Sequence, residues 1–406
     1  MTLNKNNSNK ITIVFLIGIA IIIRLILALI NVYPFDFWCF GQWTARILSL
    51  NNAFNWSDLY LNLPPETVYP VLPVALYGYG LFGFLGKIIF GHQLFTSPFI
   101  ARIVLKLLAI VSDLLVGFFI YKLLVPKFSK TKAIVISLFF LLNPAVFFVS
   151  SLWGQIDALG ALMVLISVYF LNKKFYRWAW IFIFLAILAK LQSIFFLPLI
   201  FVLDFWNNHW RKTIINVAVA SLAVFVILLP FMAALLKLLY IMFSGAGFYA
   251  YLSINAFNFW QIFQWRPIHL NFIAENHWYL FAALIIFAVF YFLILKKLLK
   301  NQNTYNLTFA CLLIAFSAFM FLTKMHERYL FPAIMFMPIL LSWQKKYLAN
   351  YILISLCYLA NLIYALFAIK ALYQISIVFA ILNLANFAHL FYDYYQQKNS
   401  NRPTHP

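Results

Sequence analysis

Charged residues of either sign are scarce in this chain, and acidic residues are the scarcest. Its 406 residues include nine aspartates and glutamates and 29 lysines and arginines, so charged residues make up 9% of the sequence. Hydrophobic residues make up 66%, whereas soluble domains contain about 45–50% apolar residues. This composition excludes a soluble globular fold. It predicts an all-α polytopic membrane protein that forms one transmembrane domain over residues 1–406.

Motifs typical of the common catalytic and cofactor sites are also missing. The three cysteines, Cys39, Cys311 and Cys357, lie far apart and lack the spacing of metal ligands. The sequence has no phosphate-binding glycine loop, no dinucleotide-binding glycine motif and no nucleophile elbow. We therefore expect neither a cofactor nor a metal requirement. The formal net charge of +20 is expected to face anionic membrane lipids rather than nucleic acid.

Long apolar windows predict about 12 membrane-spanning segments. They lie near residues 11–31, 99–121, 133–149, 157–171, 178–189, 191–204, 214–236, 277–295, 305–322, 329–342, 350–369 and 372–392. The stretch 69–90 is apolar too, but it contains Pro70, Pro73 and several glycines, so we expect a juxtamembrane or re-entrant helix. If it does not cross, most lysines and arginines fall on the face that holds both termini. The positive-inside rule makes that face cytoplasmic.

This topology places the polar segments of the chain on the external face. Two of them are long connections, 32–98 and 237–276, which we expect to carry juxtamembrane helices. The others are short and have the sequences SLWGQID (151–157), KLQ (190–192) and KMHER (324–328). Because all of them lie at the same face of the predicted bundle, the sequence predicts that they form one external site.

Asp36 is the strongest candidate for a general base. It follows the first predicted span in the stretch VYPFDFWCFGQW, where a carboxylate can reach both water and a lipid chain; an ordinary interfacial residue is the alternative interpretation. Asp157 begins a predicted span, so a first-turn acid favoured by the helix dipole competes with a catalytic role. Asp113, deep in a span, is expected to make an intramembrane polar contact. The remaining acids are expected to be solvated loop residues: Asp58, Glu66, Asp204, Glu275 and Asp393.

Two basic residues on the external face are candidates for binding a phosphate, Arg328 as a bidentate fork and Lys190 as a point charge. Snorkelling of a long side chain to the interface is the alternative for both. It explains Lys190 poorly, because this lysine interrupts an apolar run instead of flanking it. His326 and Glu327 are the neighbours of Arg328 in sequence, and a purely structural pairing with it is their alternative role.

Several of these stretches resemble a known family when they are taken in order. DFWCFGQW, YPVLP, LLNPAVFFVSSLWGQIDALG, LAKLQSIFFLPL, SINAFNFWQIF and MHERYLFP are similar to motifs of the polyprenol-phosphate-sugar-dependent glycosyltransferases of the GT-C superfamily. The chain most resembles the bacterial relatives of the GPI-anchor mannosyltransferase PIG-V. The resemblance extends over about residues 33–332 and depends on the order of the motifs. Two departures are YPVLP, where many relatives show YPPL, and a first loop with one acid near the membrane instead of an acidic pair.

The resemblance implies an inverting transfer of a hexose such as mannose from a polyprenyl-phosphate sugar to a hydroxyl of a glycan, lipid or protein. It implies a bacterial cytoplasmic membrane, with the reaction on the external face. Asp36 would remove the acceptor proton, and Lys190, Arg328 and His326 would hold the leaving phosphate, where preorganised cations lower the barrier. The residues placed around the substrates are Tyr69, Trp153, Gln155, Asp157, Gln192, Asn255, Asn258, Trp260 and Glu327.

A polytopic transporter or lipid flippase for a glycan or lipid-linked substrate is the alternative function, because it also needs sparse polar groups in a helix bundle. Transporters tend to hold substrates near the midplane on broken helices, whereas these candidates are predicted at one face. A polymerase or ligase that joins lipid-linked glycans would share the donor chemistry, and only its products would distinguish it.

Overall fold

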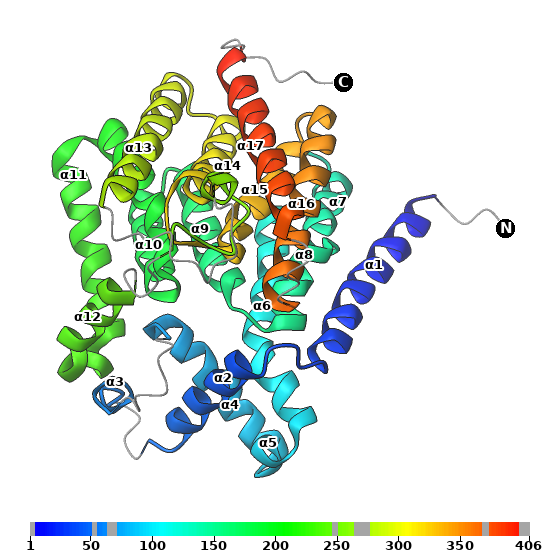
Figure 1. Ribbon diagram of the computed structural model, residues 1–406, viewed down its shortest axis with the longest axis vertical. Helices are drawn as coiled ribbons and strands as arrows, with labels where there is room; N and C mark the ends of the chain where they lie inside the picture. Colours follow the sequence, from blue (N-terminus) through cyan, green and yellow to red (C-terminus); the bar gives the residue numbers. More distant parts are fainter. Residues whose placement is uncertain are drawn as a thin grey trace. The chain divides into compact units, whose positions relative to one another are not determined.

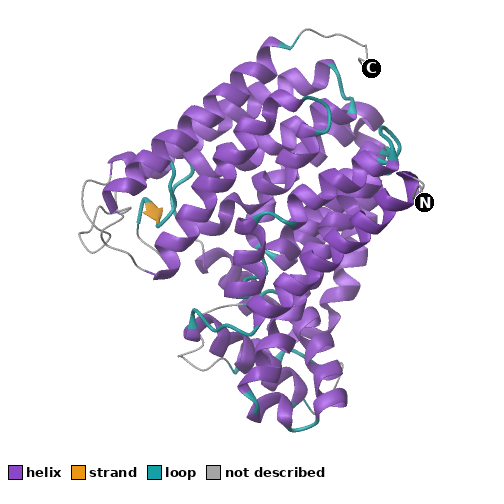
Figure 2. Cartoon of the chain, turned by 90° about the vertical axis from the view of Figure 1, so that its right-hand side faces the viewer, coloured by secondary structure: helices purple, strands orange, loops and turns teal. Residues whose placement is uncertain are grey.

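The chain is an all-α polytopic membrane protein. The computed structural model describes residues 5–50, 55–62, 71–245, 251–263, 277–367 and 373–397, and helices account for nearly all of them (Figures 1 and 2). The chain divides into two compact units, Met1–Tyr249 and Ala250–Pro406. The boundary falls within the predicted second external loop, 237–276. Both units consist largely of apolar helices. The prediction that they form one transmembrane domain over residues 1–406 stays a prediction.

The first unit contains fifteen helical elements in the described residues. They are α1 (Lys5–Ala28), α2 (Pro34–Leu48), α3 (Asp58–Leu61), α4 (Pro73–Phe90), α5 (Gln93–Thr96), α6 (Pro98–Leu124), α7 (Lys130–Leu141), α8 (Pro144–Phe147), the π-helix η1 (Phe148–Trp153), α9 (Asp157–Asn172), α10 (Tyr176–Ala189), the 3-10 helix η2 (Leu191–Phe196), α11 (Leu197–Leu228), the 3-10 helix η3 (Leu229–Ala234) and α12 (Leu235–Gly245). Proline begins four of these helices, where its missing N–H leaves no bond unmade.

The second unit consists of helices and two very short strands. Its elements are β1 (Ser253–Ile254), η4 (Phe259–Phe263), α13 (His277–Lys300), α14 (Thr304–Phe321), β2 (Met325–His326), η5 (Glu327–Leu330), α15 (Phe331–Leu341), η6 (Lys345–Tyr347), α16 (Leu348–Phe367) and α17 (Tyr373–Gln396). The segment Thr304–Phe321 is 94% buried, so α14 is the central helix of this unit. Strand β1 pairs with β2 in parallel, with Ser253 opposite Met325.

Helix length and hydropathy bear on the predicted spans. Among the described residues, seven helices are long and apolar enough to cross a membrane, or eight if the pair formed by Lys130–Leu141 and Pro144–Trp153, bent by 50°, counts as one. The predicted count of about 12 crossings stays a prediction. Helix α4 is among the seven, so the prediction that 69–90 does not cross needs its own test.

Helix α11 folds back on itself at His209, whose φ of 59° and ψ of 168° are not helical. Residues 12 positions apart on a straight helix are separated by about 18 Å. Yet the Nδ2 atom of Asn216 lies 3.2 Å from both carboxylate oxygens of Asp204. The residues before and after His209 therefore form two antiparallel helical segments, which correspond to the predicted spans 191–204 and 214–236.

The same contact corrects the expectation that Asp204 is a solvated loop residue. Its side chain is fully buried and accepts further hydrogen bonds from Trp180 Nε1 and Asn208 Nδ2, both at 2.8 Å. A buried carboxylate must find several donors, and the turn at His209 brings a third one, Asn216, to it. Asp204 therefore holds the two segments of α11 together, and helix α10 with them.

The expected intramembrane contact of Asp113 is confirmed. Arg24 Nε of α1 lies 3.1 Å from Asp113 Oδ2 of α6, and both residues are fully buried. Ser150 of the π-helix donates to the same oxygen at 2.5 Å, and Arg24 also donates to the carbonyl of Leu141. This network joins α1, α6 and the chain between α7 and α9, so it supports the segment that leads to Trp153.

Candidate functional site

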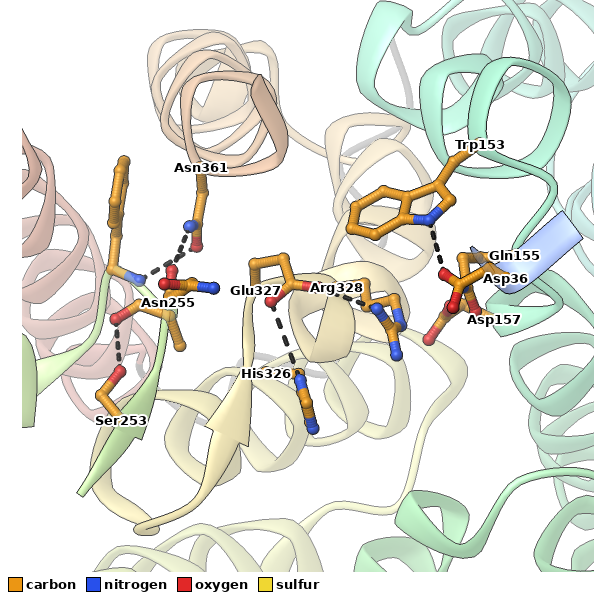
Figure 3. A network of polar contacts seen from close by, with 12 residues as sticks. Asp36, Trp153, Gln155, Asp157, Ser253, Asn255, His326, Glu327, Arg328 and Asn361 are labelled. Atoms are coloured by element: carbon orange, nitrogen blue, oxygen red, sulfur yellow. Dashed lines mark hydrogen bonds and ion pairs between the residues drawn. The ribbon is translucent and has the colours of Figure 1, made fainter. Parts of the chain in front are cut away.

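Asp36 lies in the first turn of α2, directly after the connection that follows α1. Its side chain is 4% exposed. Trp153 Nε1 donates a hydrogen bond to Asp36 Oδ2 at 2.8 Å, and Gln155 Nε2 donates to the same oxygen at 2.5 Å. Figure 3 shows the indole N–H of Trp153 directed at the Asp36 carboxylate. The structure therefore joins two sequence motifs that are more than a hundred residues apart.

The backbone around Gly154 explains how two neighbouring side chains reach one oxygen atom. Trp153 is the last residue of the π-helix, and Gly154 follows it with a φ of +92°, a conformation that residues with a side chain rarely adopt. The amide groups of Gly154 and Gln155 both bond to the carbonyl of Val149. This tight turn ends the helix and presents Trp153 and Gln155 toward Asp36.

The two donors leave the Asp36 carboxylate unevenly satisfied. Both bonds end on Oδ2, and among the described residues no donor is bonded to Oδ1. Indole and amide N–H groups can only donate, so both bonds hold Oδ2 in place as an acceptor. An oriented carboxylate with one oxygen held by the protein can accept a proton on the other, which is the geometry that a general base needs.

Asp157, Lys190 and Gln192 form a second cluster in the first unit. Lys190 Nζ lies 2.6 Å from Asp157 Oδ1, and Gln192 Nε2 donates to the same atom at 3.2 Å. Asp157 is fully buried at the start of α9, and the Lys190 side chain, 15% exposed, lies in the break between α10 and η2. Lys190 therefore has a carboxylate partner, which explains a lysine within an apolar run better than snorkelling does.

His326, Glu327 and Arg328 form the polar cluster of the second unit (Figure 3). Arg328 Nη1 lies 2.9 Å from Glu327 Oε1, and His326 Nδ1 lies 3.8 Å from Oε2. Glu327 is 3% exposed. Burial raises the pKa of Glu327, but the charge of Arg328 and the contact with His326 lower it by more, so this pKa lies below its ordinary value. The acid is ionised, and it holds the guanidinium group in a fixed position.

The connection that precedes α13 packs against this cluster. Beyond the β1–β2 pair, Lys324 donates its N–H to the carbonyl of Leu252 at 2.9 Å. Asn361 of α16 bonds to the carbonyl of Asn255 and the N–H of Phe257, and Asn255 has a left-handed φ of 58°. The predicted motifs SINAFNFW and KMHER thus lie side by side.

Asn258 and Trp260, predicted near the substrate, use their side-chain N–H groups within the fold. Asn258 Nδ2 donates to the carbonyl of Phe319 at 3.1 Å, and Trp260 Nε1 donates to the carbonyl of Phe321 at 2.8 Å. Both carbonyls belong to the last turn of α14, where no helical partner remains for them. These contacts cap the helix and fix the connection that carries Asn255.

Three further observations complete the comparison with the predicted site. Tyr69 lies outside the described residues. In the described part of the chain, no group of three or more histidines, cysteines and acids is placed to hold a metal ion. Sequence reasoning missed Lys106, which bonds to the backbone carbonyl before Trp153, and Asn361, which bonds to the backbone of Asn255 and Phe257. A polar residue inside an apolar helix was the only available signal for them.

Comparison of the chain with protein-family models and with curated proteins finds no match. The resemblance to the GT-C superfamily therefore stays a prediction, and the clusters described above are the basis for any assignment of function.

Proposed function

We propose that this chain is a membrane glycosyltransferase of the GT-C type. It transfers a hexose such as mannose from a polyprenyl-phosphate sugar to a hydroxyl of a glycan, lipid or protein acceptor. The observation that carries the proposal is the Asp36 carboxylate, which is buried, held on Oδ2 by Trp153 and Gln155, and preceded along the chain by α1, the first predicted span. A base at this position would serve a substrate whose lipid chain lies in the membrane.

In the proposed reaction Asp36 takes the proton of the acceptor hydroxyl while the hydroxyl oxygen attacks the anomeric carbon of the donor sugar. The bond from that carbon to the phosphate oxygen breaks, the configuration inverts, and the polyprenyl phosphate leaves with the electron pair. Arg328 is proposed to bind the leaving phosphate, supported by the fixed geometry of its pair with Glu327. Lys190 and His326 are the further candidates for this role. The mechanism uses no metal, so activity is expected to persist in a chelator.

The first test is release of polyprenyl phosphate by purified protein from a panel of polyprenyl-phosphate sugars with candidate acceptors. The Asp36→Asn variant is expected to lose about 10²–10⁴-fold in kcat, the usual contribution of a general base. Asp58→Asn, a change at an exposed acid of α3, is the matched control and should retain full activity. Normal turnover by Asp36→Asn would refute the assignment of the base.

Transport of a glycan or lipid-linked substrate is the second candidate. The 50° break between Lys130–Leu141 and Pro144–Trp153, with its π-helix, favours it, because broken helices and π-helices recur at transport and other functional sites. Uptake of substrate into proteoliposomes without consumption of donor would support transport and contradict the transferase.

The proposed location is the bacterial cytoplasmic membrane, with both termini in the cytoplasm and the reaction outside. The three native cysteines are buried, so a single cysteine introduced at Lys130, an exposed residue, can be labelled selectively. Labelling by an impermeant reagent only after the cells are opened supports this topology. Labelling of intact cells would contradict it.

A further inference from the structure

Two cations of α6 bind the backbone of the two residues that follow α1. Helix α1 ends at Ala28, and the N–H groups of Leu29 and Ile30 bond back to carbonyls of its last turn, which leaves the carbonyls of these two residues beyond the helix. Arg102 Nη1 donates to the carbonyl of Leu29 at 3.0 Å, and Lys106 Nζ donates to the carbonyl of Ile30 at 2.6 Å. Cations are favoured near a helix C-terminus, because the aligned carbonyl groups give it a partial negative charge. The chain leaves this end and reaches Asp36 six residues later.

Lys106 also binds a second segment. Its Nζ atom donates to the carbonyl of Leu152 at 2.8 Å, in the residue before Trp153. One ammonium group thus bridges the backbone that precedes Asp36 and the backbone that precedes its hydrogen-bond donors. The side chain is 1% exposed, and a Cβ atom at Gly154 would lie 3.1 Å from Lys106 Cγ. The glycine therefore leaves room for the lysine as well as permitting the turn.

We propose that Lys106 is a positioning residue, which holds the segment of Asp36 and the segment of Trp153 and Gln155 in register and so orients the carboxylate for proton transfer. This inference rests on the proposed function. Lys106 bonds only to backbone carbonyls in the described chain, so it acts through the residues that it places. Displacement of a catalytic group by about 1 Å can lower a rate by about 10²-fold.

Lys106→Met keeps the length of the side chain and removes its donors. We expect kcat to fall by about 10²-fold with an unchanged KM for the donor. Hydrogen exchange followed by mass spectrometry should show faster exchange in two peptides together, residues 29–38 and 149–157. Lys106→Arg, which retains donors for both carbonyls, should restore part of the rate and of the protection. Lys122→Met, at an exposed residue of the same helix, is the control and should change neither.

The kinetic measurement and the hydrogen-exchange measurement test the proposal independently. Faster exchange in both peptides together with the loss of kcat supports the proposal, whereas full activity in Lys106→Met overturns it. Unchanged hydrogen exchange in Lys106→Met also overturns it, whether or not the wild type is active. Absence of sugar transfer by the wild type would by itself refute the proposed function. If Lys106→Met does not fold, Lys106→Arg and Lys106→Gln are compared instead. In that series kcat must follow the protection of the two segments, and a fully protected variant with low kcat contradicts the role.

Discussion

The ion pair between Lys190 and Asp157 leads to a prediction that does not depend on the enzymatic activity. Lys190→Met would leave the Asp157 carboxylate, which is fully buried, without its cation. Breaking a buried ion pair from one side costs about 3–5 kcal/mol, because an uncompensated charge remains in the interior. For a folding unit the size of Met1–Tyr249, each kcal/mol shifts the melting temperature by about 2–4 °C. The expected loss is therefore roughly 6–20 °C.

The assay is thermal unfolding of purified protein in detergent, with Lys122→Met as the control for a change at an exposed lysine. Asp157→Asn combined with Lys190→Met removes both charges and should recover most of the lost stability, since Gln192 can still bond to the neutral side chain. A Lys190→Met variant that melts with the wild type would refute the reasoning. If Lys190 also binds the donor phosphate, the double variant will be stable and show a raised KM for the donor.

Three further predictions follow from single side chains. Trp153→Phe removes one of the hydrogen-bond donors to Asp36. Because a hydrogen bond to a charged group contributes about 1.5–3 kcal/mol, we expect kcat to fall by roughly 10–150-fold. Unchanged steady-state kinetics would contradict this. Burial, and then the nearby charge of Asp36, raise the pKa of Cys39 to about 11, so maleimide should leave it unlabelled at neutral pH in the folded protein, and rapid labelling would show that the site is open. Burial raises the pKa of Glu327, but Arg328 lowers it by more, so the pKa in the folded protein lies below the ordinary value. The ionised acid therefore stabilises the fold at pH values above the ordinary carboxyl pKa. This stabilisation disappears as the pH falls through the lowered pKa. The melting temperature should therefore drop below about pH 4.5, the ordinary value, and should drop less in Arg328→Met; equal slopes in the two proteins would count against the pair.

Much of the helical structure could be predicted, because an apolar run long enough to span a membrane must bond its own backbone groups there. The window 99–121 became α6 (Pro98–Leu124), and 305–322 became α14 (Thr304–Phe321). The turn at His209 was predicted as a polar break between two spans. The burial of Asp204 was not, because it depends on a donor 12 residues further along the chain that reaches it only after the helix folds back.

The site was predicted as a set of residues but not as a set of contacts. Asp36 and Lys190 were selected because ionisable groups beside apolar runs are costly and few, and Trp153 and Gln155 were selected from the resemblance. Their partners could not be selected in this way. Trp153 and Gln155 were placed around a substrate, whereas the structure bonds both to Asp36, and Lys190 was assigned to a phosphate, whereas it pairs with Asp157.

The sequence by itself determined that this protein lies in a membrane as helices, since composition and the length of apolar runs are local properties that each segment carries alone. It also limited the possible ionisable site residues to a small number. Only the tertiary structure decided which of them meet. A hydrogen bond between Asp36 and Trp153, or between Lys106 and the carbonyl of Leu152, depends on how α1, α2, α6 and the π-helix pack, and packing is a property of the whole unit.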